Sequence, residues 1–214
     1  GDNMNYRNTR NYENLNKRIF KGVGPYEIPQ IEATHFESCE FVGFNYAAQA
    51  KKREEKGIHF FLDDYQFERL WKTPDRYLSM LYDFKYVMTP DFSTYTDFPK
   101  IIQIYNHYRK HWIGAYLQEN CVDVIPTIGW STPDSYEWCF DGEPTNSVVA
   151  VSSVGTQNNE EAKELFVLGY KEMVKRLEPE TIIFYGSIPE ECKENIVHIK
   201  AFHEKFKEAR CNGW

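Results

Sequence analysis

Three carboxylates, Asp63, Asp64 and Asp91, stand where this chain could carry out chemistry. The pair follows the apolar run 57–62, and Asp91 follows the run 85–89. If both runs are neighbouring strands, roughly 5 Å apart, the three side chains share one rim, where they repel one another and attract a hard cation. We therefore predict that they are catalytic acid–base residues, with Asp64 and Asp91 as ligands of a divalent ion such as Mg²⁺.

The aspartate pair also has a structural interpretation. Asp63 is followed three residues later by Gln66, which is the pattern of a capping box. One of the two aspartates would then cap the helix that begins near Tyr65. The other would face the rim towards Asp91, because neighbouring side chains of a strand point in opposite directions.

Hydroxyl and aromatic groups stand at other predicted strand ends. The hydroxyls of SSVGT (152–156) and its free N–H groups could cradle a phosphate, although both glycine-rich phosphate-binding patterns are missing and an ordinary strand-to-helix loop is the alternative. Trp130 could stack on a planar ligand or fill the top of a barrel. The candidate ligand-binding residues are Trp130, Ser152, Ser153, Thr156 and Tyr185.

Two histidines, His107 and His111, are spaced by four residues, which places both imidazoles on one face of a helix. This spacing suits a zinc site, but basic residues flank the pair and the apolar stripe of segment 97–119 lies opposite. We therefore expect both histidines to lie in water. The face expected against the sheet consists of Ile101, Tyr105, Trp112 and Tyr116.

An alternation of apolar and helical segments must position these residues. Strands are expected at 26–33, 39–47, 57–62, 85–89, 122–130, 147–155, 181–187 and 196–202. Helical segments are expected from 63 to about 83 with a restart at Pro74, and at 97–119, 132–142, 158–177 and 203–210. Apolar strands joined by helices predict an α/β fold with a parallel sheet and helical crossovers. We prefer a (β/α)-barrel-like closure, because eight strands suffice for one, over an open doubly wound sheet.

Composition and charge indicate one α/β domain, residues 25–214, behind a polar basic arm, residues 1–24. The arm has five basic and two acidic residues, so its charge of +3 leaves −10 for the rest of a chain whose net charge is −7. Such an acidic body is unsuited to nucleic acid, except through the arm. Five scattered cysteines and the lack of a signal-like or membrane-spanning apolar run predict a cytoplasmic protein without a membrane partner.

Four blocks of the chain resemble an uncharacterised family, domain of unknown function 4417, found in bacterial, phage and mobile-element genomes. The blocks are HFFLDDYQFERLW, VMTPDFSTYTDFPKIIQIYNHYRKHWIGAYLQ, VIPTIGWSTPDSYEWCFDG and SVVAVSSVG. The resemblance extends from about Ile28 to about Gly186. It implies a phage or mobile-element setting, and it implies no activity, cofactor or catalytic residue.

Two functions are therefore open. The first is a small-ligand-binding or enzymatic domain that uses the acidic, hydroxyl-rich strand ends for a phosphate-bearing or nucleotide-like molecule with a divalent metal. The alternative is a non-catalytic interaction protein of phage or mobile elements. A deep pocket at the rim favours the first, and a filled rim with a flat aromatic patch favours the second.

Overall fold

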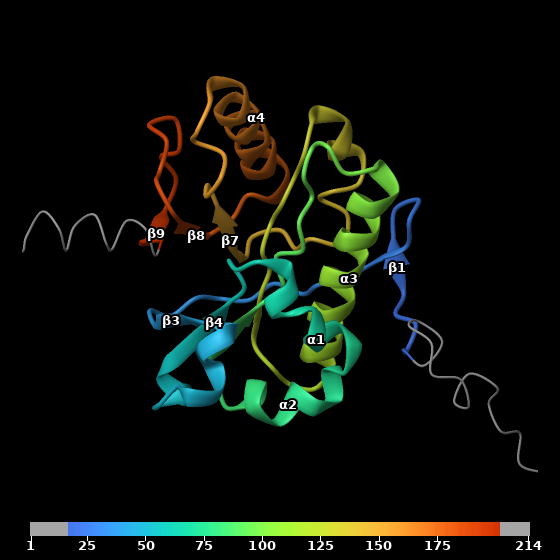
Figure 1. Cartoon of the computed structure of the whole chain (residues 1–214), viewed down its shortest axis with the longest axis vertical. Coiled ribbons are helices and arrows are strands. Elements are labelled where there is room, and N and C mark those ends of the chain that lie inside the picture. Colours follow the sequence, from blue (N-terminus) through green and yellow to red (C-terminus); the bar gives the residue numbers. More distant parts are fainter. Residues whose placement is uncertain (1–16, 202–214) are drawn as a thin grey trace, which may run out of the picture.

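The computed structural model describes residues 17–201, and their seven parallel strands form two sheets (Figure 1). One sheet contains β3 (Glu40–Gly43), β4 (Lys56–His59), β5 (Tyr86–Met88) and β6 (Val124–Ile125). The other contains β7 (Val148–Ser152), β8 (Thr181–Tyr185) and β9 (Ile196–Ile199). In both sheets the spatial order of the strands follows the chain.

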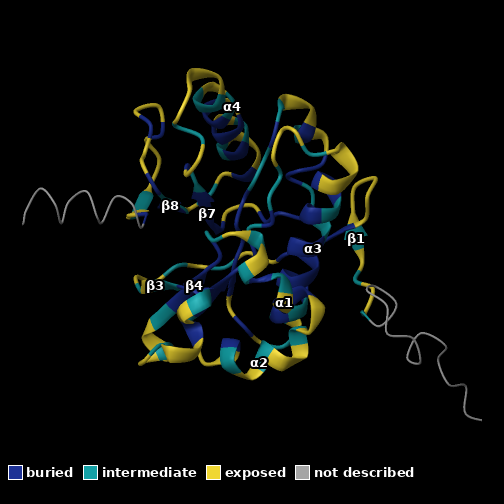
Figure 2. Ribbon diagram, in the orientation of Figure 1, coloured by how far each residue is buried: buried dark blue, intermediate teal, exposed yellow. Residues whose placement is uncertain are grey.

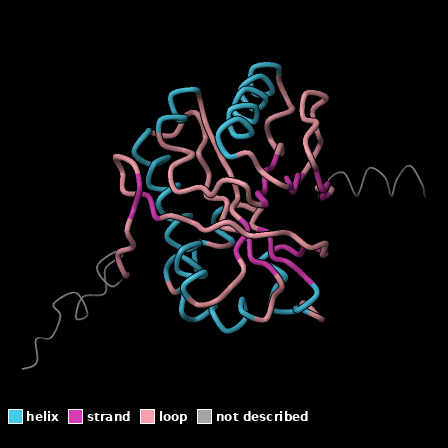
Figure 3. Tube along the Cα trace, turned by 180° about the vertical axis from the view of Figure 1, so that it is seen from behind, coloured by secondary structure: helices cyan, strands magenta, loops and turns pink. Residues whose placement is uncertain are grey.

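The two sheets are joined beside β6. Thr127 pairs with Ala150 as an isolated parallel bridge, and the N–H of Ile128 donates to the carbonyl of Ala150 at 2.8 Å. Figure 3 shows both groups of strands near the centre of the molecule. The α/β fold with parallel strands is confirmed. Closure of the strands into a barrel is not confirmed, because within residues 17–201 β3 and β9 each pair with a single strand. The alternative of an open sheet fits this arrangement.

Helical segments make every crossover between the parallel strands except the one from β8 to β9. They are η2 (Phe44–Gln49), η3 (Arg53–Glu55), η4 (Asp64–Gln66), α1 (Glu68–Lys72), α2 (Pro74–Tyr82), α3 (Lys100–Glu119), η5 (Pro133–Glu137) and α4 (Glu160–Leu177). The predicted restart at Pro74 is confirmed. Asn159 caps α4, because its side chain accepts a hydrogen bond from the N–H of Ala162 at 2.8 Å. Residues 44–47, expected as the end of strand 39–47, belong to the 3₁₀ helix η2, and the helix expected at 203–210 lies outside the described residues.

Both faces of strands β4 to β8 are mostly buried, as expected for a parallel sheet covered by helices, whereas the edge strands β3 and β9 are partly exposed. The residues of β7 alternate between two hydrophobic clusters. Val149 and Val151 pack in one cluster with residues of α4, whereas Val148 and Ala150 belong to the other, which contains residues of β4 and β5. Figure 2 shows this buried centre beneath an exposed shell of loops and helix surfaces. None of the helices within residues 17–201 is both long and apolar enough to cross a membrane.

Helix α3 corrects a prediction, because it is buried on its polar side as well. His107 and His111 are 2% and 0% exposed, whereas Ile101, expected against the sheet, is 67% exposed. The histidines lie against β2 (Ile28–Pro29), which pairs with β1 (Gly22–Val23), and against the segment after η5, where backbone carbonyls accept their N–H groups. Polar side chains can be buried when partners of this kind satisfy them.

The described part of the expected N-terminal arm also lies on α3. The indole N–H of Trp112 donates to the carbonyl of Arg18 at 2.7 Å, and Phe20 packs edge-on against the same indole at 5.7 Å between ring centroids. Residues 17–20 therefore contribute contacts to the core. Residues 1–16 lie outside the described part of the chain.

Candidate functional site

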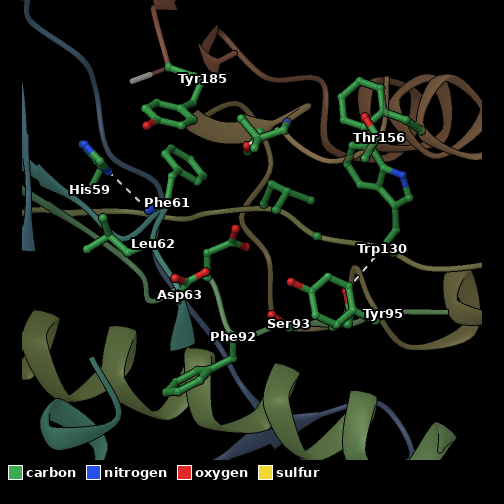
Figure 4. Close-up of a pocket in the computed structure, with 18 of the residues that line it drawn as sticks. His59, Phe61, Leu62, Asp63, Phe92, Ser93, Tyr95, Trp130, Thr156 and Tyr185 are labelled. Carbon is green, nitrogen blue, oxygen red and sulfur yellow. Dashed lines mark hydrogen bonds between the residues drawn. The ribbon is translucent and has the colours of Figure 1, made fainter. Parts of the chain in front are cut away.

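A cavity of about 1360 Å³, called the rim pocket below, lies at the carboxyl ends of the parallel strands (Figure 4). Each of the seven strands supplies residues at or just after its end. One from each, in chain order, is Gly43, Asp63, Asp91, Trp130, Ser152, Tyr185 and Lys200. Carboxyl ends of parallel strands are where α/β folds place their ligand sites, and the cavity is large enough for a small organic molecule.

Aromatic rings from two strands meet at one wall of the rim pocket. Phe61 stacks on Tyr185 with ring centroids 4.8 Å apart and an interplanar angle of 22°, and the His59 ring lies 5.7 Å from Phe61. Figure 4 shows Phe61 and Tyr185 together, away from Trp130 and Thr156. Three strands separate β4 from β8, a span of roughly 19 Å in a flat sheet. The strand array therefore curves around the pocket.

Asp64 does not line the rim pocket; it holds the loop after β5. Its carboxylate accepts two hydrogen bonds from Ser93, one from the main-chain N–H at 3.1 Å and one from the hydroxyl at 2.8 Å. The side-chain amide of Asn106 donates to the carbonyl of Ser93 at 2.6 Å. The loop that carries Asp91 is thus fixed from β4 and from α3.

Asp91 is half-buried in the wall of the rim pocket, and no hydrogen bond to its carboxylate is found within residues 17–201. Burial raises the pKa of this carboxyl to about 7; the positive charge of Lys110 lowers the pKa, and the negative charge of Asp64 raises it. A carboxyl group with a pKa near neutral pH can both give and take a proton. The acid–base role of Asp91 stays a prediction, and this pKa is the value that such a role would need.

The structure brings most of the predicted residues together. Those that line the rim pocket are Asp63, Asp91, Trp130, Ser152, Thr156 and Tyr185. Ser153 does not, because it is buried and its hydroxyl donates to the carbonyl of Ser187 at 2.6 Å. The predicted cap is corrected as well: Asp63 precedes η4 but makes no side-chain capping bond, and Asp64 is used by Ser93.

Sequence reasoning missed two residues of the aromatic wall, His59 and Phe61. They belong to the run HFFL, which was interpreted as strand interior, whereas β4 ends at His59. The sequence signal that could have identified them is a polar ring, His59, within an apolar run, two positions before Phe61. Alternation along an extended segment places such a pair on one face.

The magnesium site at Asp64 and Asp91 stays a prediction. Within residues 17–201 a single group of three histidine, cysteine or acidic residues has ligand atoms close enough to hold a metal. That group is His107, His111 and Glu143, and it lies away from the rim pocket.

Comparison with known proteins places the chain among phage proteins. Residues 20–203 match the family model "Domain of unknown function (DUF4417)". The Gene 1 protein of Mycobacterium phage L5 is 39% identical over 180 residues, which cover 83% of this chain and 79% of that protein. The Gene 1 protein of Mycobacterium phage D29 is 36% identical over 180 residues, which cover 83% of this chain and 67% of that protein. No solved structure matches. The chain belongs to the DUF4417 family.

Proposed function

We propose that this domain binds a small, nucleotide-like molecule in the rim pocket and exchanges a proton with it through Asp91. The observation that carries the proposal is the position of Asp91. A half-buried carboxyl with a pKa near 7 stands in the wall of a large cavity that also contains an aromatic stack. Titratable groups perturbed in this way are concentrated at functional sites.

The aromatic wall supports a planar ring as part of the ligand. The stacked pair of Phe61 and Tyr185 offers a face on which a base could lie, and stacking of a base on an aromatic side chain contributes roughly 1–3 kcal/mol. His59 extends this wall.

The part of the rim pocket beside the amino end of α4 supports a phosphate. Thr156 and Asn159 line the pocket there, while Ser152 and Lys200, which stand on either side of Tyr185 at the ends of β7 and β9, add a hydroxyl and a positive charge. Main-chain N–H groups and the helix dipole favour an anion at such a place. A nucleoside monophosphate would thus have its base on the aromatic wall and its phosphate at α4.

Calorimetric titration of the full chain with the common nucleoside monophosphates and the matching nucleosides tests binding. We expect at least one monophosphate to bind, and Phe61→Leu to weaken its binding at least roughly tenfold, because a stack is lost. Phe84→Leu is the control, since Phe84 is buried just before the amino end of β5. Absence of binding, or equal binding by Phe61→Leu, would refute the proposal.

Proton exchange is tested with the same titration in buffers of different ionisation enthalpy near pH 7. If the ligand changes the protonation of Asp91, the apparent enthalpy of binding depends on the buffer. We expect Asp91→Asn to bind and to lose that dependence. Asp123→Asn, exposed before the amino end of β6, should keep it. A dependence that persists in Asp91→Asn would assign the proton to another group.

A further inference from the structure

A second cluster of chemically competent side chains lies on the far side of α3. His107 and His111 stand one helical turn apart with ring centroids 4.4 Å apart, and Glu143 reaches them from the segment after η5. One ligand atom from each residue lies within 4.8 Å of the others, and all three residues are buried. The rim pocket contains none of them.

Backbone carbonyls fix the tautomer of both imidazoles. Nε2 of His107 lies 3.0 Å from the carbonyl of Asp141, and Nδ1 of His111 lies 2.8 Å from the carbonyl of Pro29. A carbonyl only accepts, so both nitrogens carry hydrogens. Nδ1 of His107 and Nε2 of His111 are therefore the nitrogens with which each ring could bind a metal. Metal-binding histidines in proteins are usually oriented by such a second hydrogen bond.

Glu143 supplies an oxygen that has no partner. Its Oε1 lies 2.7 Å from Nε2 of His111 and 3.3 Å from Nζ of Lys110. Its Oε2 is fully buried and makes no hydrogen bond with any residue of 17–201, although buried polar atoms nearly always make one. An unpaired carboxylate oxygen beside two oriented imidazoles is what a bound cation would satisfy.

The backbone before Glu143 is shaped for this position. Gly142 has φ of +75°, and a Cβ there would lie 2.5 Å from the carbonyl oxygen of Pro29 and 2.8 Å from Nδ1 of His111. Only glycine adopts this conformation without strain and leaves the space. Gly142 therefore allows Glu143, β2 and α3 to approach one another.

We propose that His107, His111 and Glu143 bind one divalent transition-metal ion of the zinc type. Two imidazoles and one carboxylate are a ligand set that Zn²⁺ uses in proteins. Bonds of about 2.0–2.2 Å in a tetrahedron separate ligand atoms by roughly 3.4 Å, so the 2.7 Å hydrogen bond between Nε2 of His111 and Oε1 of Glu143 must break for Oε2 to bind the ion. The ion replaces the proton of that hydrogen bond, and the proton leaves to solvent. Water supplies the fourth ligand.

Such a centre would crosslink the fold. It would connect three segments that are distant in the chain: α3, the segment containing Glu143 and, through the hydrogen bond of His111, β2. Lys110 can stay on Oε1 while the ion uses Oε2. Without the ion, the same residues form a buried network of charges and hydrogen bonds. The test must distinguish a metal site from this metal-free network.

The test uses the full chain after removal of metals with a chelator and dialysis. We expect one equivalent of Zn²⁺ to bind and to raise the melting temperature, and Co²⁺ to give the visible absorption of a tetrahedral nitrogen–oxygen site. Glu143→Gln keeps the shape of the side chain, and His107→Gln keeps a polar group. Each should lower the affinity for Zn²⁺ by at least roughly 100-fold, since changes to outer-shell partners alone cost 10–100-fold.

His35→Gln is the matched control, because His35 is an exposed histidine paired with Glu180 at the surface. It should keep one equivalent of Zn²⁺ and the Co²⁺ spectrum. Failure of the wild-type chain to bind either ion would leave the hydrogen-bonded network alone and overturn the proposal. An unchanged Co²⁺ spectrum in a folded Glu143→Gln or His107→Gln would overturn it too. If either variant fails to fold, the wild-type stoichiometry still decides.

Discussion

Asp64 and Ser93 connect the carboxyl ends of two neighbouring strands. The carboxylate, just after β4, accepts the main-chain N–H of Ser93 at 3.1 Å and its hydroxyl at 2.8 Å, in the loop after β5. Asp63, the adjacent residue, is exposed and makes no side-chain capping bond. The two aspartates therefore have separate roles: one holds the loop that carries Asp91, and the other faces the rim pocket.

Replacing Asp64 should destabilise the fold. Asp64→Ala leaves the N–H and the hydroxyl of Ser93 without their charged acceptor, so the free energy of unfolding should fall by about 1.5–3 kcal/mol. Urea denaturation measures it. Asp63→Ala is the control and should change the free energy of unfolding by less than about 0.5 kcal/mol, as expected for a surface residue. Equal effects of the two substitutions would contradict the separate roles.

The pKa of Asp91 should make stability depend on pH. Burial raises this pKa to about 7, above the value of 3.8 for an unperturbed aspartate, so the folded state binds a proton more tightly than the unfolded state. The resulting stabilisation is complete below about pH 4 and is lost as the pH rises through about 7.

Asp91→Asn removes this titration. Between about pH 5 and pH 8 the wild type should lose roughly 1–3 kcal/mol more stability than Asp91→Asn does. Urea denaturation at several pH values gives the difference, with Asp123→Asn as the control that should follow the wild type. Parallel curves for the wild type and Asp91→Asn would show that the carboxyl titrates normally.

The sequence predicted the order of the elements because local chemistry determines where they begin. Asn159 caps α4, Pro74 begins α2, and apolar runs mark strands that are covered on both faces. It also predicted that residues at the carboxyl ends of several strands lie close together, since strand ends of a parallel array converge. It could not predict that His107 and His111 are buried. Their partners, Glu143 and two backbone carbonyls, lie between 32 and 82 residues away in the chain. Helical periodicity reports only which residues of a helix share a face.

Gly169 of α4 should prove necessary for the wall formed by Trp130. A Cβ at this position would lie 2.2 Å from Cδ1 of the indole, so Gly169→Ala must displace the ring, which packs on Phe166. Although alanine favours a helix by about 1 kcal/mol over glycine, overpacking typically costs 1–3 kcal/mol. We expect a net loss of stability in urea denaturation and weaker binding of any ligand of the rim pocket.

Gly129→Ala is the matched control for this substitution. A Cβ at Gly129, next to Trp130 in the chain, meets its nearest atom, Oγ1 of Thr94, at 3.8 Å. The variant should therefore keep the wild-type stability within about 0.5 kcal/mol. If Gly169→Ala were as stable as this control, the indole would have room to move, and the close contact would have no consequence for the pocket wall.

Arg109 should not tolerate lysine, although the charge is kept. Nη1 of its guanidinium donates to both carboxylate oxygens of Glu68 at 2.8 and 2.9 Å, Nη2 donates to the Asn106 side chain at 2.7 Å, and the group lies 3.9 Å above the centre of the Phe92 ring. Lysine provides one flexible ammonium instead of a planar fork. Arg109→Lys should therefore lower the free energy of unfolding by about 1.5–3 kcal/mol.

Arg76→Lys, exposed on α2, controls for the general effect of this substitution and should change stability by less than about 0.5 kcal/mol. The guanidinium also connects α1 to the loop after β5, since Glu68 belongs to α1 and Asn106 binds Ser93. Arg109→Lys should therefore also increase amide hydrogen exchange at Ser93, whose N–H donates to Asp64. Wild-type stability and exchange in Arg109→Lys would mean that a positive charge alone, without the fork, holds α3 against α1.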